Sequence, residues 1–219
     1  MDKYEVRARI QEIGIIPAVR VSSHDDALFA CEAVAQAGIP IVELTMTVPG
    51  AVDLLVAINR HTPELIAGAG TVLDLDTAKR CLDAGAHFLT SPGLELDVVE
   101  FAAKREVLVL PGALTPSEVL AAWKAGGDMV KVYPCAQVGG PKYIKALRGP
   151  FPQIPLIASG GVNHHTASEF ILAGAAALGI GGNLIPREAV QERRPERIAE
   201  LARRFREIVV ESRALLAAK

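Results

Sequence analysis

The feature that most constrains the fold is a regular alternation of short apolar runs with longer helical stretches. Stretches such as SHDDALFACEAVAQAG and TPSEVLAAWKAGG begin with Ser or Thr and end with Gly, which is typical of capped helices. Between such stretches we expect eight strands, at residues 15–20, 41–46, 65–70, 87–91, 107–110, 129–133, 156–158 and 177–180. Strands that alternate with helices in this way form a parallel sheet.

Eight such units in a chain of 219 residues favour a closed (β/α)8 barrel, with an extra helix in the N-terminal stretch MDKYEVRARIQEIGII. A doubly wound open sheet is the alternative. No linker or low-complexity stretch divides the sequence, so we expect residues 1–219 to form a single domain.

Composition excludes several classes of protein. The formal net charge is −2, which gives no sign of a nucleic-acid or membrane partner. No apolar run is long enough to span a membrane, and the N-terminal stretch lacks the apolar core of a signal peptide. Cys31, Cys81 and Cys135 form no metal or disulfide pattern, which indicates a reducing cytoplasm.

The dipeptide Ala-Gly recurs before the second, fourth, sixth and eighth expected strands. Five residues after each of these glycines stand Glu43, Thr90, Lys131 and Gly179. In a barrel, alternate strands contribute side chains to the same interior layer. The spacing therefore predicts that Glu43 and Lys131 point into the barrel at a similar height.

Lys131 stands in the middle of the apolar run MVKVYP. A buried lysine is costly unless it is paired or neutral, and burial disfavours the ammonium form. A neutral amine attacks carbonyl groups to form a Schiff base, whose protonated form accepts the electrons of a breaking C–C bond. The other interpretation is a lysine at a strand end whose ammonium group reaches solvent.

Two further charged residues lie in apolar strands, Glu43 in PIVELTMT and Arg20 at the end of IIPAVR. A carboxylate within hydrogen-bond reach could move the protons of Schiff-base chemistry, and an arginine could bind a substrate carboxylate or tune the glutamate. Equally, Glu43 could only pair with Lys131 or Arg20, and Arg20 could be a surface residue. Charges at the carboxyl ends of three strands predict a site at the face where barrel enzymes build theirs.

Glycine-rich turns follow the last two expected strands, in LIASGGVN and LGIGGNLIP. Glycine lets backbone N–H groups approach an anion, and barrels often bind phosphate at these two loops. A single Gly-Gly more often marks only a turn. His164 and His165 follow the first turn, and we expect them to face solvent because no third ligand has metal spacing. Cys135, near the mouth of the barrel, has no paired histidine and is interpreted as a packing residue.

Taken together, these motifs resemble the 2-keto-3-deoxy-6-phosphogluconate (KDPG) / 4-hydroxy-2-oxoglutarate (KHG) aldolase family. VELTMTVPGA, GAGTVL, TSPGL, PGALTPSE, KVYP, GPKYIKALRGPFPQIPLI and SGGVN occur in the family's order, between IIPAVR and GIGGNLIP. The resemblance implies a class I aldolase on a (β/α)8 barrel. Such an enzyme cleaves KDPG, KHG or both to pyruvate and an aldehyde, which is glyceraldehyde 3-phosphate or glyoxylate.

The resemblance also implies roles for individual residues. Lys131 would form the Schiff base and Glu43 would move protons. Substrate-binding residues would be Arg20, Thr45, Thr71, Pro92 and Tyr133, and phosphate-binding residues Ser159, Gly160, Gly161, Gly181 and Gly182. It further implies a cytoplasmic homotrimer that needs no metal or other cofactor and has no nucleic-acid or membrane partner, only a small keto acid substrate.

The sequence departs from the family pattern at several positions. Thr47 stands where many members have an arginine, which removes a possible anion contact. Tyr133 replaces the usual Phe, Ser159 the usual Thr, and Gly182 or Asn183 a frequent serine. Phosphate binding would then depend on backbone N–H groups, or the substrate carries no phosphate.

There are three alternatives to the KDPG/KHG interpretation, and two of them, the silent barrel and the metal-dependent aldolase, are disfavoured, the silent barrel because Lys131, Glu43 and Arg20 are all present. A close relative acts on the galactonate-derived phospho-sugar acid, and a catalytically silent barrel would only bind a phosphorylated metabolite. A metal-dependent class II aldolase is disfavoured, because no histidines and carboxylates cluster at ligand spacing in the sequence.

Overall fold

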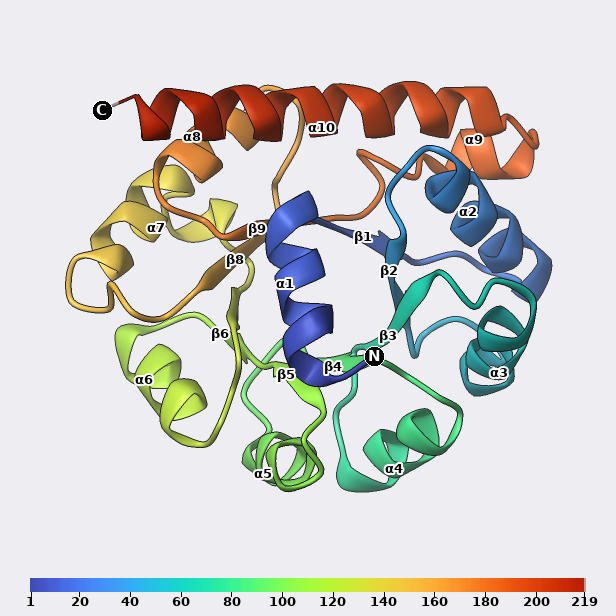
Figure 1. Cartoon of the computed structure of the whole chain (residues 1–219), viewed down its shortest axis with the longest axis horizontal. Coiled ribbons are helices and arrows are strands. Elements are labelled where there is room, and N and C mark those ends of the chain that lie inside the picture. The colour runs from blue at the N-terminus through green and yellow to red at the C-terminus, as the bar shows by residue number, and fades with distance from the viewer. Residues whose placement is uncertain (219) are drawn as a thin grey trace.

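The structure is a computed structural model that describes residues 1–218, in which the strands surround a common centre and the helices lie outside them (Figure 1). The nine strands of these residues pair in parallel in the order β5-β4-β3-β2-β1-β9-β8-β7-β6. They are β1 (Ile15–Val19), β2 (Ile41–Thr45), β3 (Ile66–Gly70), β4 (Phe88–Thr90), β5 (Leu108–Leu110), β6 (Gly112–Ala113), β7 (Val130–Val132), β8 (Leu156–Ser159) and β9 (Ala177–Ile180). The (β/α)8 barrel that the sequence predicts is confirmed, and the open sheet is wrong.

The ninth strand results from a proline within the fifth barrel position. Pro111 has no N–H to donate and separates β5 from β6. β5 pairs with β4 and β6 pairs with β7, so the two pieces together close the barrel. The Pro111 carbonyl still accepts a hydrogen bond from the Lys131 backbone N–H at 2.9 Å, which ties this segment to β7.

Helices follow most strands and form the outer layer. They are α1 (Lys3–Ile13), α2 (His24–Gln36), α3 (Ala51–His61), α4 (Leu75–Asp83), α5 (Leu96–Lys104), α6 (Pro116–Lys124), η1 (Ala136–Val138), α7 (Pro141–Arg148), α8 (Ala167–Leu172), α9 (Arg187–Gln191) and α10 (Pro195–Ala217). The caps are those the sequence predicts. Ser23 accepts the Asp26 N–H, and Thr115 with Glu118 forms a capping box.

The expected extra N-terminal helix is α1, which leads into the start of β1 and lies across the end of the barrel where the strands begin (Figure 1). Its Val6 and Ile10 are buried against the barrel. Lys3 of the same helix forms an ion pair with the nearly buried Asp128, with Nζ 3.2 Å from Oδ1. Because this end is closed by α1, a substrate must reach the barrel interior from the other end.

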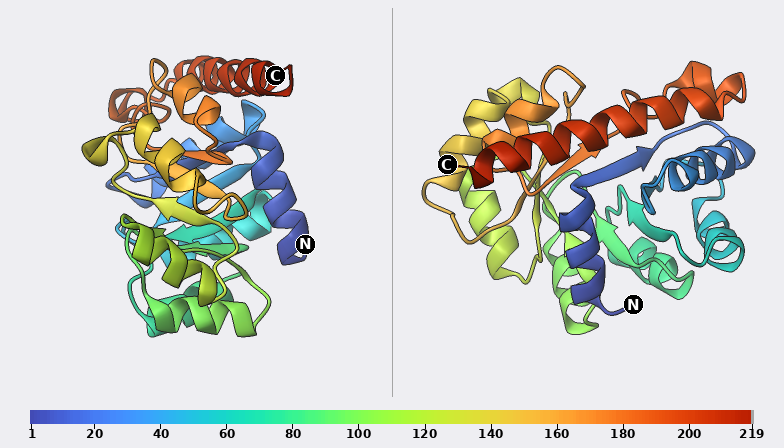
Figure 2. Two further views of the ribbon diagram at one scale, coloured as in Figure 1. Left: turned by 90° about the vertical axis from the view of Figure 1, so that its left-hand side faces the viewer. Right: turned by 45° about the horizontal axis from the view of Figure 1, so that its top comes forward.

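The long helix α10 runs over α8 and α2 along one side of the barrel (Figures 1 and 2). It buries Ile198, Ala202, Phe205 and Val209 against the rest of the chain. No helix within residues 1–218 has both the length and the apolar character that a membrane crossing requires.

Candidate active site

Glu43 of β2 and Lys131 of β7 meet inside the barrel. The Lys131 Nζ donates to both Glu43 carboxylate oxygens, at 3.1 Å from Oε1 and 3.0 Å from Oε2. The Glu43 and Lys131 side chains are only 5% and 11% exposed, respectively, so the pair lies in the barrel interior and not on the outer surface. The distances confirm the positions that the Ala-Gly spacing predicts, whereas the roles of both residues stay predictions.

Glycines keep space open around this pair. A Cβ at Gly70, at the end of β3, would clash with the Glu43 carboxylate, which would have to shift. A Cβ at Gly179 of β9 would lie 2.8 Å from the Ser159 hydroxyl. The fourth residue of the predicted layer, Thr90, is buried and donates its hydroxyl to the Leu110 carbonyl at 2.8 Å. The interior layer therefore offers one amine and one carboxylate beside open space.

A cavity of about 410 Å³ opens above the pair at the carboxyl ends of the strands. It is lined by almost every residue that the sequence assigns to the site. These are Arg20, Glu43, Thr71, Pro92, Lys131, Tyr133, Ser159, Gly160, Gly161, Gly181 and Gly182. Residues not singled out as site residues, among them Ala18 and Val162, complete the lining.

Thr45 is the one expected site residue that does not line this cavity. Its side chain is fully buried, and its hydroxyl donates to the Val19 carbonyl at 3.0 Å. The same hydroxyl lies 2.9 Å from the Thr47 hydroxyl. The structure therefore places Thr45 in the wall behind the cavity, where it fixes β2 to β1 and the chain that follows.

Thr71 adopts an unusual backbone conformation at the end of β3. Its φ is 59°, in the left-handed region that a β-branched residue rarely occupies. Such strain costs on the order of 1–3 kcal/mol and persists where the surrounding structure imposes it, often at functional sites. Thr71 lines the cavity, as expected from the sequence, whereas its positive φ is an observation that the sequence did not offer.

The two glycine turns lie next to each other at one side of the cavity. Gly160 and Gly161 have φ values of 84° and 86°, and a Cβ at Gly161 would meet the Ala136 side chain at 2.2 Å. Asn183 donates its side-chain amide to the Val162 carbonyl at 2.9 Å and so links the second turn to the first. The Asn183 amide is thus engaged in holding the loops together.

The cysteines and paired histidines take no part in this arrangement. Cys135 is buried with Sγ 3.7 Å from the Gly140 carbonyl, and burial raises the pKa of its thiol to about 11. His164 and His165 are exposed, as the sequence predicts. Within residues 1–218, no three His, Cys, Asp or Glu side chains form a group suited to a metal ion.

A family model described as KDPG and KHG aldolase matches residues 6–201 of the chain. The KHG/KDPG aldolase of Escherichia coli strain K12 is 33% identical over 190 residues, which covers 86% of this chain and 89% of that protein. The 2-dehydro-3-deoxy-phosphogluconate aldolase of Pseudomonas aeruginosa is 32% identical over 183 residues, with 84% of this chain and 83% of that protein covered.

Solved structures show the same similarity. The KDPG aldolase of Legionella pneumophila, with pyruvate captured as a covalent carbinolamine intermediate, superimposes with a TM-score of 0.82. It is 30% identical, and the match covers 89% of this chain and 95% of that chain. A native KDPGal structure, also 30% identical, has a TM-score of 0.83 and covers 90% of this chain and 95% of that chain.

Proposed function

The chain belongs to the KDPG and KHG aldolase family, and we propose that this class I aldolase cleaves a 2-keto-4-hydroxy acid through a Schiff base on Lys131. The observation that carries the proposal is the Lys131 amine, buried in the barrel with its nitrogen about 3 Å from the Glu43 carboxylate. An amine and a proton acceptor at this distance are what Schiff-base formation requires.

In the first half of the reaction, Lys131 attacks the C2 carbonyl of the substrate. Glu43 accepts a proton from the Lys131 ammonium group, which frees the nitrogen lone pair to form the N–C bond. The carbonyl oxygen takes a second proton from the nitrogen and becomes the carbinolamine hydroxyl. Glu43 then returns its proton to this hydroxyl, which leaves as water. The product is an iminium ion whose nitrogen belongs to Lys131.

In the second half, the C3–C4 bond breaks. Glu43, or a water that it holds, takes the proton of the C4 hydroxyl, and C4 leaves as the aldehyde. The bonding electrons move to the iminium, which becomes an enamine. Protonation at C3 and attack of water at C2 then release pyruvate and restore the Lys131 amine.

The remaining lining residues divide between the two ends of the substrate. Arg20 and Thr71 can bind the carboxylate of the pyruvate half, because a guanidinium and a hydroxyl are suitable donors to it. The turn Ser159–Gly161 and the loop Gly181–Gly182 can hold a phosphate through backbone N–H groups. KDPG and KHG are the proposed substrates. The likeness to the KDPGal structure makes the galactonate-derived phospho-sugar acid a second candidate.

Borohydride reduction in the presence of pyruvate, followed by peptide mass mapping, tests the mechanism. We expect a stable pyruvate adduct on Lys131, and none on the folded variant Lys131→Ala, which should also lose cleavage. Lys142→Ala on the outer helix α7 is the matched control and should keep both. No adduct on the folded wild-type protein would favour the silent, metabolite-binding barrel instead.

Cleavage of a panel of substrates that differ in configuration at C4 distinguishes the gluconate series from the galactonate series.

We also propose that residues 1–219 form one domain and that the protein is a cytoplasmic homotrimer without a metal. Exposed apolar side chains such as Leu73 and Leu96, about half exposed at 52% and 49%, offer surface that a subunit contact would cover. The three cysteines are free thiols, as expected in a reducing compartment. Light scattering tests the trimer, and turnover that is unchanged by EDTA tests the absence of a metal.

A further inference from the structure

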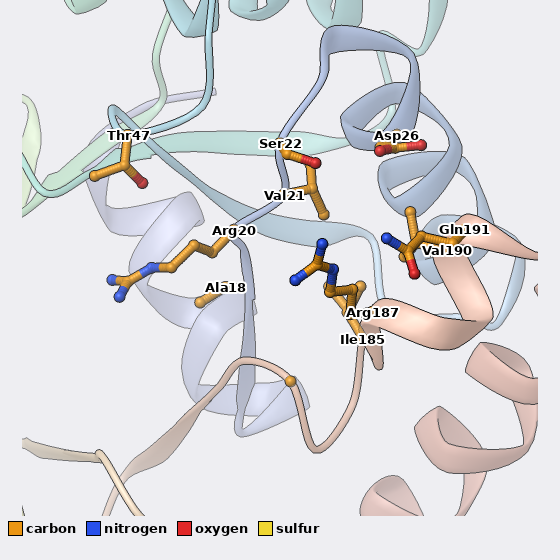
Figure 3. A pocket seen from close by; sticks show the side chains of 11 residues that line it. Ala18, Arg20, Val21, Ser22, Asp26, Thr47, Ile185, Arg187, Val190 and Gln191 are labelled. Carbon is orange, nitrogen blue, oxygen red and sulfur yellow. The ribbon is translucent and has the colours of Figure 1, made fainter.

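Figure 3 shows the side chains that line a second cavity, of about 480 Å³. This cavity adjoins the one that contains Lys131. The two cavities share Ala18, Arg20 and Gly182 in their linings, so they border each other at the second glycine loop. The second cavity extends from this boundary to the ends of α2 and α9. A substrate whose C2 carbonyl is at Lys131 can therefore place its far end here.

Arg187, the first residue of α9, projects into this cavity. In Figure 3 its side chain lies between Arg20 on one side and the Val190–Gln191 end of α9 on the other. The Arg20 side chain extends away from Arg187 in the same view. The two guanidinium groups therefore lie in different parts of the space that the two cavities form together.

Arg187 is part of no ion pair in the described portion of the chain. Arginine ion pairs within residues 1–218 involve only Arg9, Arg193, Arg194, Arg197 and Arg204. The single carboxylate that lines the cavity, Asp26, is paired with Arg193, with Oδ1 3.1 Å from Nη2. Arg187 and Arg20 thus leave two uncompensated positive charges, beside apolar side chains such as Ile185 and Val190.

The short side chain of Thr47 leaves this cavity open. Thr47 lines it, and its hydroxyl lies 2.9 Å from the Thr45 hydroxyl. A long cationic side chain at position 47 would extend into the same space.

We propose that Arg187 determines specificity by binding the terminal anionic group of the aldehyde half of the substrate. The inference rests on the proposed function, because it needs an acid held at Lys131. A guanidinium binds phosphate or carboxylate through two parallel hydrogen bonds. Gly182 of the proposed phosphate loop lines both cavities, so a terminal phosphate held there borders the space that Arg187 lines, and this phosphate is the expected occupant.

The test compares three substrates: KDPG, the same sugar acid without its phosphate, and KHG with its terminal carboxylate. We expect Arg187→Gln to lower kcat/KM for KDPG about tenfold, mainly through KM, because the variant loses a hydrogen bond between two charged groups. A tenfold change corresponds to about 1.4 kcal/mol. The unphosphorylated acid should change less than about twofold. Arg187→Lys should restore part of the loss, and added salt should reduce the difference, because the site is exposed.

Arg60→Gln, at the end of α3, is the matched control, since it removes the same charge from an exposed position away from both cavities. Loss for KHG alone would support the same site with a carboxylate as its occupant. Equal loss for all three substrates, or no loss for either anionic one, would overturn the proposal. Pyruvate trapping on Lys131 should be unchanged in Arg187→Gln, whereas wild-type protein that traps no pyruvate would instead contradict the proposed function.

Discussion

The Lys131 Nζ lies 3.0–3.1 Å from both carboxylate oxygens of Glu43, a residue 88 positions earlier in the chain. The barrel brings the two together because β2 and β7 contribute to one interior layer. Both side chains are almost fully buried, and each carries the charge that compensates the other. Burial of either charge alone would be costly.

We expect Glu43→Gln to lower kcat by about 10²- to 10⁴-fold, the usual contribution of a positioned acid–base group. The amide keeps the size and a hydrogen-bonding oxygen but cannot accept the proton of the Lys131 amine or of the C4 hydroxyl. Steady-state cleavage with circular dichroism as a folding control measures the effect. Glu100→Gln, in an exposed pair with Lys104 on α5, is the matched variant and should keep full activity. Wild-type turnover by Glu43→Gln would exclude Glu43 as the proton acceptor.

Gly70→Ala should inactivate the enzyme while leaving it folded. The new methyl group would clash with Oε1 and Cγ of Glu43, so the carboxylate must leave the position in which it pairs with Lys131. Turnover should fall by at least about tenfold, since small misplacements of catalytic groups are known to cost up to 10²-fold. The midpoint of urea unfolding should change much less. A variant that loses stability and activity in parallel would show that the substitution disturbs the barrel as a whole.

Much of this arrangement could be predicted from the sequence, because a barrel repeats one local pattern. Strand positions follow from apolar runs between cap signals, and the Ala-Gly spacing is sufficient to place Glu43 and Lys131 in one layer. The split at Pro111 was missed, since β6 has only two residues and no periodicity of its own. The place of Thr45 behind the cavity depends on its bond to the Val19 carbonyl, a contact between strands that no local pattern reveals.

Arg187 was missed for a related physical reason. It lies in the irregular stretch NLIPREAV, where neither helical nor strand periodicity indicates the direction of a side chain. Only the path of the chain from β9 to α9 brings it beside Arg20. The one available signal was its position directly after the expected phosphate loop.

The cysteines should be unreactive in the folded protein. Burial raises the pKa of Cys31 to about 12 and the pKa values of Cys81 and Cys135 to about 11. At pH 8, a thiol with a pKa of about 11 is thiolate in roughly one molecule in a thousand, against about a quarter for a free cysteine. Iodoacetamide at pH 8 should leave turnover unchanged and label the three cysteines only after unfolding. Rapid alkylation of native Cys135 with loss of activity would show that its thiol is accessible at the mouth.

The ion pair between Lys3 and Asp128 should stabilise the fold without affecting catalysis, because it lies at the closed end of the barrel. Asp128 also accepts the Val109 N–H through Oδ2 at 3.1 Å, and its side chain is only 9% exposed. Lys3→Met keeps the aliphatic stem but leaves this carboxylate without its cation. We expect a loss of about 1–3 kcal/mol in the free energy of unfolding, measured in urea, with kcat unchanged.

Arg9→Met on the same helix is the control. It breaks the exposed pair with Glu12 and should lower the free energy of unfolding by less than about 1 kcal/mol. Equal losses in the two variants would mean that α1 contributes through its apolar face alone.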